Sequence, residues 1–141
     1  MQTQVPFNII PIEEDGFHLQ LSGKINDNDV NLLIDTGASR SVFDENKIKA
    51  ILGENLIEEI EKLSTGLGTN SMQSKKAVLE SFKIGDIHLH NYEVAVLDLS
   101  HVNQSYTQIG LDEIAGVIGS DLLYDMKAVI DYDKSTLTLN Q

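Results

Sequence analysis

The chain has 141 residues, of which 41% are hydrophobic and 23% charged, a length and composition that predict one globular domain over residues 1–141. It contains no cysteine, which excludes a disulfide scaffold, thiolate zinc sites and cysteine catalysis. Its net charge of −12 repels phosphate backbones, so we expect no nucleic acid among its partners.

No run of apolar residues approaches the roughly 20 that a membrane-spanning helix needs. The first residues, from Met1 to Phe7, lack both the basic start and the apolar stretch of a signal peptide. We therefore expect a cytoplasmic protein with no membrane partner.

Residues 17–34 have the pattern of a β-hairpin. Apolar and polar residues alternate from Phe17 to Leu21, as in a half-buried strand. The four Asn and Asp residues at 26–29 tolerate turn conformations, and an apolar run at 30–34 follows. A strand, an Asx-rich turn and a second strand predict a hairpin.

Residues 42–63 have the periodicity of a helix. Their apolar residues fall on a single stripe, and Asp44 and Glu45 suit the positive end of a helix dipole. Gly53 interrupts the stripe, so two shorter helices are an alternative to one long helix.

From Ala77 onward the pattern is again mainly β. Strands are expected around the turn at Gly85, at residues 92–97, and in a closing hairpin around residues 133–135. The polar residues 101–108 predict a loop, and residues 121–125 a short helical turn. The fold class is therefore mainly β with one inserted helix.

The segment from Leu32 to Ser39 carries the strongest candidate for chemistry. Asp35 directly follows an apolar strand, where ionisation of a carboxylate is costly. Thr36 and Gly37 supply a hydroxyl group and a close backbone N–H. Carboxylates in such surroundings gather at functional sites, although Asp35 could instead only cap a turn.

A second segment, residues 115–123, ends an apolar strand at Gly119 and enters a short helix. Because Gly119 has no side chain, the strand can pass close to another backbone at this point. The sequence thus predicts a tight crossing near the end of the chain.

Together these two segments resemble the retroviral-type (retropepsin-like) aspartic proteases, in particular their single-domain bacterial members. The resemblance rests on the sequence Ile-Asp-Thr-Gly-Ala-Ser at 34–39, on Val-Ile-Gly at 117–119, and on Asp-Leu-Leu at 121–123. It extends in order over most of the chain, from Phe17 to Leu139.

The resemblance implies a closed acid-protease β-barrel with the helix inserted after the Asp35 loop, and a homodimer that hydrolyses a peptide or protein substrate. Each chain would supply one catalytic Asp35. Two close carboxylates share one proton, so one can activate water while the other polarises the peptide carbonyl. Thr36 would lock the two loops together and Gly37 would bring its N–H to the carboxylates. No metal or other cofactor is implied.

Ala38 stands where pepsin-like enzymes place a hydroxyl residue that donates to the carboxylate. Without that donor the anion is less stabilised, so the pair should ionise at higher pH. We therefore expect a working range of about pH 5 to 7.

The resemblance also implies a flap that closes over the substrate. The candidate is Ser64–Ser71, in which Gly66 and Gly68 permit a hairpin turn and Leu67 could touch a substrate side chain. Ala38 completes the expected substrate contacts. The alternative is that this segment is an ordinary connector.

Two further interpretations stay open. His88 and His90 lie two positions apart with His101 nearby, a set that could hold zinc, although a solvated strand face has the same pattern. The same fold could also serve as a non-catalytic peptide-binding or dimerisation module that keeps Asp35, because a fold does not fix a function.

Overall fold

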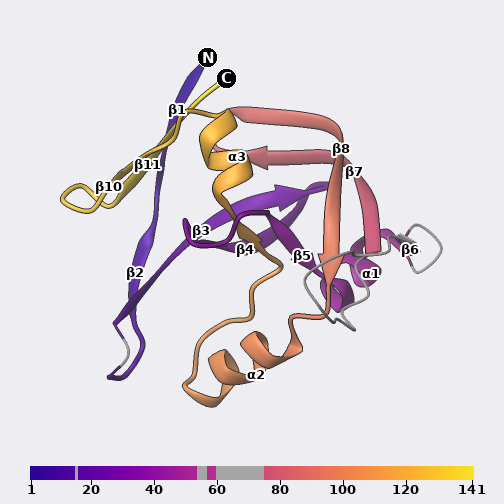
Figure 1. The fold of residues 1–141 in the computed structure, drawn as a ribbon, viewed down its shortest axis with the longest axis horizontal. Coiled ribbons are helices and arrows are strands. Elements are labelled where there is room, and N and C mark those ends of the chain that lie inside the picture. The colour runs from indigo at the N-terminus through magenta and orange to yellow at the C-terminus, as the bar shows by residue number, and fades with distance from the viewer. Residues whose placement is uncertain (15, 54–56, 60–74) are drawn as a thin grey trace.

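The structure is a computed structural model that describes residues 1–14, 16–53, 57–59 and 75–141 (Figure 1). In chain order the described elements are β1 (Gln2–Pro6), β2 (Asn8–Pro11), β3 (Phe17–Ile25), β4 (Asn28–Ile34), β5 (Val42–Asp44), α1 (Glu45–Leu52), β6 (Ile57–Glu59), β7 (Lys75–Ile84), β8 (Ile87–Leu97), α2 (Ser100–Gln108), β9 (Gly116–Ile118), α3 (Ser120–Asp125), β10 (Val129–Asp131) and β11 (Thr136–Asn140).

Six of the described strands close into a barrel. Neighbouring strands pair in the order β3, β4, β9, β5, β8 and β7, and β7 pairs back onto β3 through Lys24 and Ile25. The apolar faces of these strands fill the interior, and their largest fully buried side chains include Phe43, Phe82 and Leu32. The predicted mainly β fold and its closed barrel are therefore confirmed.

Strand β9 lies between two strands that follow each other in sequence. It runs parallel to β4, with Ile34 opposite Ile118, and antiparallel to β5, with Val42 opposite Val117. The residues that join β4 to β5 must therefore pass over the end of β9. Gly116 makes this packing possible, since a Cβ there would lie 2.6 Å from the ring of Phe43.

A second, smaller sheet gathers both ends of the chain. β11 lies between β1 and β10, and all pairs are antiparallel. The two termini consequently meet at one corner of the molecule (Figure 1), where Met1 and Gln141 are hydrogen-bonded. The closing hairpin of β10 and β11 was expected from the sequence and is confirmed, whereas β1 and β2 were not anticipated.

The predicted helix over residues 42–63 is wrong in its extent. Residues 42–44 form β5, the helix covers only Glu45–Leu52, and residues 57–59 form β6, which pairs with β7. Asp44 begins the helix by accepting the Lys47 N–H on its side chain. Gly53 ends it with a φ of +95°, a conformation that glycine adopts readily.

The prediction of a loop at 101–108 is also wrong, because these residues form α2. The helix is mostly polar, so it lacks the apolar stripe that sequence patterns detect. It is held instead by Asn103, whose buried amide donates to the Ile114 carbonyl at 3.1 Å and accepts from the Ile114 N–H at 2.8 Å. Tyr106 packs on the same side of the helix, in a small core with Leu33 and Val117.

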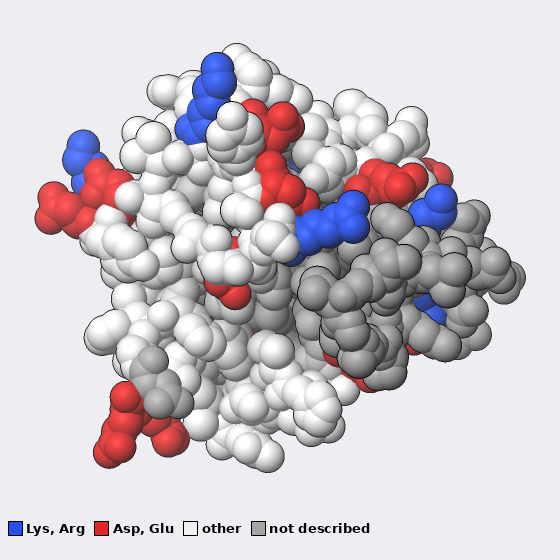
Figure 2. Space-filling model, in the orientation of Figure 1, with Lys and Arg blue, Asp and Glu red and all other residues white. Residues whose placement is uncertain are grey.

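The charged side chains are unevenly spread over the molecule. Figure 2 shows acidic and basic groups mixed across the upper part of one face, further acidic groups at its edges, and few charged groups over its lower middle. Among the helices that the structure describes, none is long and apolar enough to cross a membrane.

Candidate active site

Asp35 lies at the first position after β4, in the loop of residues 35–41 that crosses β9. We call this segment the Asp35 loop. The Asp35 N–H donates to the Ile118 carbonyl at 2.9 Å, so the loop starts as a continuation of the β4–β9 pairing. The Gly37 N–H donates to Oδ1 of Asp35 at 2.9 Å and the Ala38 N–H to the Asp35 carbonyl at 3.1 Å. These bonds fix the direction of the carboxylate.

The loop turns tightly against the end of β9, as the sequence predicted for Gly119. A Cβ on Gly119 would lie 2.7 Å from the Ala38 carbonyl oxygen and 2.7 Å from the Arg40 carbonyl carbon. The Ser120 N–H donates to the Ala38 carbonyl at 2.8 Å, which ties the loop to the start of α3. Two segments about 80 residues apart in sequence thereby form one rigid unit.

Ser41 and Asp121 lock this unit, and the sequence analysis did not identify either residue as part of the site. Oδ1 of Asp121 accepts from the Ser41 N–H at 2.9 Å, the Ser41 hydroxyl at 2.7 Å and the Leu122 N–H at 2.8 Å. The Ser41 Oγ in turn accepts the buried Gly119 N–H at 2.8 Å. The available signal was a hydroxyl residue six positions after Asp35 and a carboxylate two positions after Gly119.

Replacing Ser41 with Ala should destabilise the fold by about 1–3 kcal/mol, since it leaves the buried Gly119 N–H without its acceptor. Urea unfolding followed by circular dichroism measures this change. Ser39→Ala, in an exposed position of the same loop, is the matched control and should change stability by less than about 0.5 kcal/mol. Equal stability of the two variants would contradict the locking role of Ser41.

The three residues expected to carry catalysis lie on the surface of the single chain. Asp35, Thr36 and Gly37 are all exposed. The expectation that Asp35 is desolvated is therefore not met within one chain, and burial would require a second molecule to cover the loop. The Thr36 hydroxyl forms no hydrogen bond with any residue that the structure describes, so it is available for a contact outside the chain.

A hollow lies beside the carboxylate. It is lined by Asp35 and Thr36 together with residues of β3, β4 and the β10–β11 hairpin, namely Phe17, His18, Leu19, Leu33, Ile34, Ile130 and Tyr132. Phe17 and Tyr132 are 67% and 63% exposed, which is unusual for large aromatic side chains. An exposed apolar rim next to a carboxylate is typical of a surface that another molecule covers.

His18 borders this hollow and a second one. Its Nδ1 lies 2.6 Å from the Tyr106 hydroxyl, which fixes the imidazole between β3 and α2. The second hollow, between β2, β3 and α2, is mostly apolar and includes Ile12, Val102 and Ile109. The two hollows meet at His18, so together they form one groove that runs from Asp35 toward α2.

The predicted flap, Ser64–Ser71 with Gly66, Leu67 and Gly68, lies outside the residues that the structure describes. Ala38, the remaining expected substrate contact, is half-buried in the Asp35 loop.

Of the three histidines considered for zinc in the sequence analysis, His88 and His90 lie on β8 and His101 lies in α2. The His88 and His90 rings are 3.9 Å apart, and Nε2 of His88 lies 2.7 Å from the Ser81 hydroxyl. Partial burial and the neighbouring His90 lower the pKa of His88. Within the described part of the chain, no three His, Asp or Glu residues gather where they could hold a metal ion.

Comparison with known proteins identifies a family and a fold. The family model described as aspartyl protease matches residues 21–122, which is well over half of the chain and includes the Asp35 loop and β9. No curated protein matches the sequence significantly.

Solved structures of three proteins share the fold. The retroviral protease-like domain of Ddi1 from Leishmania major has a TM-score of 0.63 at 15% identity, covering 88% of this chain and 89% of that one. A retropepsin-like aspartic protease from Rickettsia conorii has a TM-score of 0.58 at 20% identity, covering 99% and 89%. The EIAV protease complexed with the inhibitor HBY-793 has a TM-score of 0.52 at 18% identity, covering 79% and 90%.

Proposed function

The chain belongs to the aspartyl protease family, and on that premise we propose that it is an aspartic endopeptidase that acts as a homodimer. The observation that carries the proposal is the placement of Asp35. It is exposed at the end of a buried strand, and its loop is fixed by Gly119, Ser41 and Asp121 beside a groove with an apolar rim. One chain offers one such carboxylate, so a second copy is needed for the pair.

The paired arrangement accounts for the chemistry without a cofactor. At close range two carboxylates hold a single proton, because two negative charges repel. The ionised Asp35 takes a proton from a bound water as the water oxygen attacks the peptide carbonyl carbon. The protonated Asp35 of the second copy polarises the carbonyl oxygen. When the C–N bond then breaks, a proton passes to the leaving amine and the pair returns to its starting state.

The bonds within the Asp35 loop support this role for Asp35. The Gly37 N–H donates to Oδ1 of Asp35, while Oδ2 accepts no hydrogen bond from any residue that the structure describes. A carboxylate held in one direction requires little reorganisation when the reaction begins. The exposed Thr36 is placed to bond the loop of the second copy, which would bring the two carboxylates together.

Mass spectrometry of a diverse peptide mixture, incubated with concentrated protein from pH 4 to 7, tests the proposal. We expect internal cuts that disappear with the Asp35→Asn variant. If a sample whose mass shows it to be dimeric cuts no peptide at any pH, the proposal fails. The alternative, a peptide-binding or dimerisation module on the same fold, would then be favoured.

Ala38 sets the expected pH dependence. A hydroxyl at this position would donate to the carboxylate and stabilise its anion, so its absence moves ionisation of the pair to higher pH. The cleavage rate should therefore peak at about pH 5 to 7, and Ala38→Ser should move the acidic limb of the profile to lower pH. Cleavage rates measured at closely spaced pH values check this, and a maximum near about pH 3 for the unmodified protein would contradict it.

A further inference from the structure

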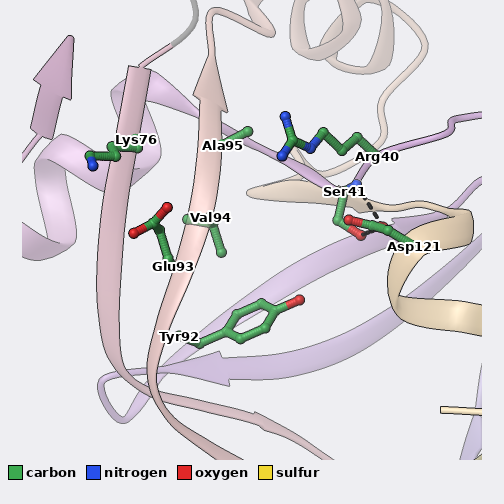
Figure 3. Close-up of a pocket in the computed structure, with 8 residues that line it drawn as sticks. All are labelled: Arg40, Ser41, Lys76, Tyr92, Glu93, Val94, Ala95 and Asp121. Atoms are coloured by element: carbon green, nitrogen blue, oxygen red, sulfur yellow. Dashed lines mark hydrogen bonds between the residues drawn. The ribbon is translucent and has the colours of Figure 1, made fainter. Parts of the chain in front are cut away.

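A pocket lies at the end of the Asp35 loop that leads into β5. Arg40, Ser41 and Asp121 form one side of it, and β7 and β8 form the other through Lys76, Tyr92, Glu93, Val94 and Ala95. Figure 3 shows the Arg40 guanidinium reaching across toward Ala95. It also shows the Tyr92 hydroxyl pointing toward Ser41 and Asp121, while the charged ends of Lys76 and Glu93 point away from Arg40.

Arg40 is an unusual residue for this chain. It is the only arginine, in a sequence with 22 acidic residues and 10 basic ones. Its side chain is exposed, and no hydrogen bond or ion pair joins it to a residue that the structure describes. The guanidinium therefore keeps its donors available, in the planar geometry that matches a carboxylate.

The acidic groups of the pocket are not partners of Arg40. Oδ1 of Asp121 already accepts three hydrogen bonds, from the Ser41 N–H, the Ser41 hydroxyl and the Leu122 N–H. Oδ1 of Asp121 is thus engaged in holding the Asp35 loop. The Glu93 carboxylate points toward β7 in Figure 3.

Tyr92 offers a second donor on the opposite wall. Its ring stacks on Phe82, with centroids 5.8 Å apart, which fixes the direction of the hydroxyl. That hydroxyl has no hydrogen-bond partner among the described residues. Burial, and then the charges of Asp121 and Asp125, raise the pKa of Tyr92, so the group remains a protonated donor.

The position of Arg40 relates the pocket to the scissile bond. Arg40 lies five positions after Asp35, so their Cα atoms are at most about 19 Å apart, and the turn at Ala38 shortens this distance. An extended peptide advances about 3.3 Å per residue. A substrate side chain within a few residues of the scissile bond can therefore reach Arg40.

We propose that Arg40 is a specificity-determining residue that binds the carboxylate of an Asp or Glu side chain in the substrate, a few residues from the scissile bond. The Tyr92 hydroxyl donates to the same carboxylate. This inference rests on the proposed function, because it assigns the substrate class of the same site. It makes the preferred substrate an acidic peptide, despite the negative charge of the protein as a whole.

Matched peptides test the inference. Starting from a peptide that the protein cleaves, single Glu, Gln or Lys residues are placed two to four positions to either side of the scissile bond, and kcat/KM is measured. At one of these positions we expect Glu to exceed Gln by about 10-fold. Arg40→Gln should remove that preference and Arg40→Glu should reverse it in favour of Lys. The control variant Lys24→Gln, which removes a positive charge from the β3–β4 hairpin, should keep the preference for Glu over Gln.

Binding measurements separate this inference from the proposed function. The Asp35→Asn variant is titrated against fluorescent Glu and Gln peptides, and anisotropy gives their affinities without cleavage. If the protein cleaves peptides but shows no preference for Glu at any position, the inference fails and the proposed function stands. If it cleaves no peptide, the proposed function fails. The inference is still supported if Glu peptides bind more tightly than Gln peptides and Arg40→Gln abolishes that difference. Equal affinities for Glu and Gln peptides would overturn the inference.

Discussion

Replacing Asp35 with Asn should lower kcat/KM for a cleaved peptide by at least about 1,000-fold, because the variant can neither accept a proton from water nor share one with its partner. The side-chain oxygen of Asn can still accept the Gly37 N–H, so the loop should keep its geometry. Steady-state kinetics measure the loss, and urea unfolding measures whether the fold is unchanged.

Asp29→Asn is the control for this experiment. Asp29 is an exposed carboxylate in the β3–β4 hairpin, paired with Lys24 at 3.3 Å, and its loss should leave the rate within about 2-fold. If Asp35→Asn retained substantial activity while folding normally, Asp35 would not be the general base and the proposed mechanism would be wrong.

Placing charges on the aromatic rim of the groove should prevent dimerisation. Phe17 and Tyr132 are exposed beside Asp35 and Thr36, and covering each of them with a second copy would stabilise the dimer by about 1.5–3 kcal/mol. The double variant Phe17→Asp/Tyr132→Asp should therefore raise the dimer dissociation constant by at least about 100-fold. Sedimentation velocity over a range of concentrations measures this change, and the cleavage rate should fall with the fraction of dimer.

Tyr124→Asp is the matched control for the aromatic rim. Tyr124 is 87% exposed on α3 but does not line the groove, so this variant should remain dimeric and active. If the double variant stayed dimeric and cleaved peptides at the original rate, the subunits would have to meet through another surface.

The parts of the fold that follow local rules could be predicted from the sequence. The β3–β4 hairpin follows from alternation and an Asx-rich turn, and the close crossing at Gly119 follows from a missing side chain. The elements that were missed depend on tertiary contacts. α2 is stabilised by the two bonds between Asn103 and Ile114, and β6 by pairing with β7, so neither has a strong local signal.

In the candidate site, too, the features with a local sequence signal could be predicted and those that depend on tertiary contacts could not. Asp35 could be identified because its motif is contiguous in sequence. The lock between Ser41 and Asp121 joins residues 80 positions apart, and only the interposed β9 brings them together. The exposure of Asp35 could not be anticipated either, because the sequence places it after a buried strand and does not reveal that the crossing loop faces solvent.

The central claim is that two Asp35 carboxylates from different copies act as one unit, and a mixing experiment tests it most directly. Unmodified protein and the Asp35→Asn variant are combined in varying proportions at constant total concentration, allowed to exchange subunits, and assayed on one cleaved peptide. Mixed dimers carry a single Asp35, so the rate should fall with the square of the unmodified fraction, to about one quarter at equal proportions. A linear fall, to about one half, would mean that each chain acts alone and would contradict the paired mechanism.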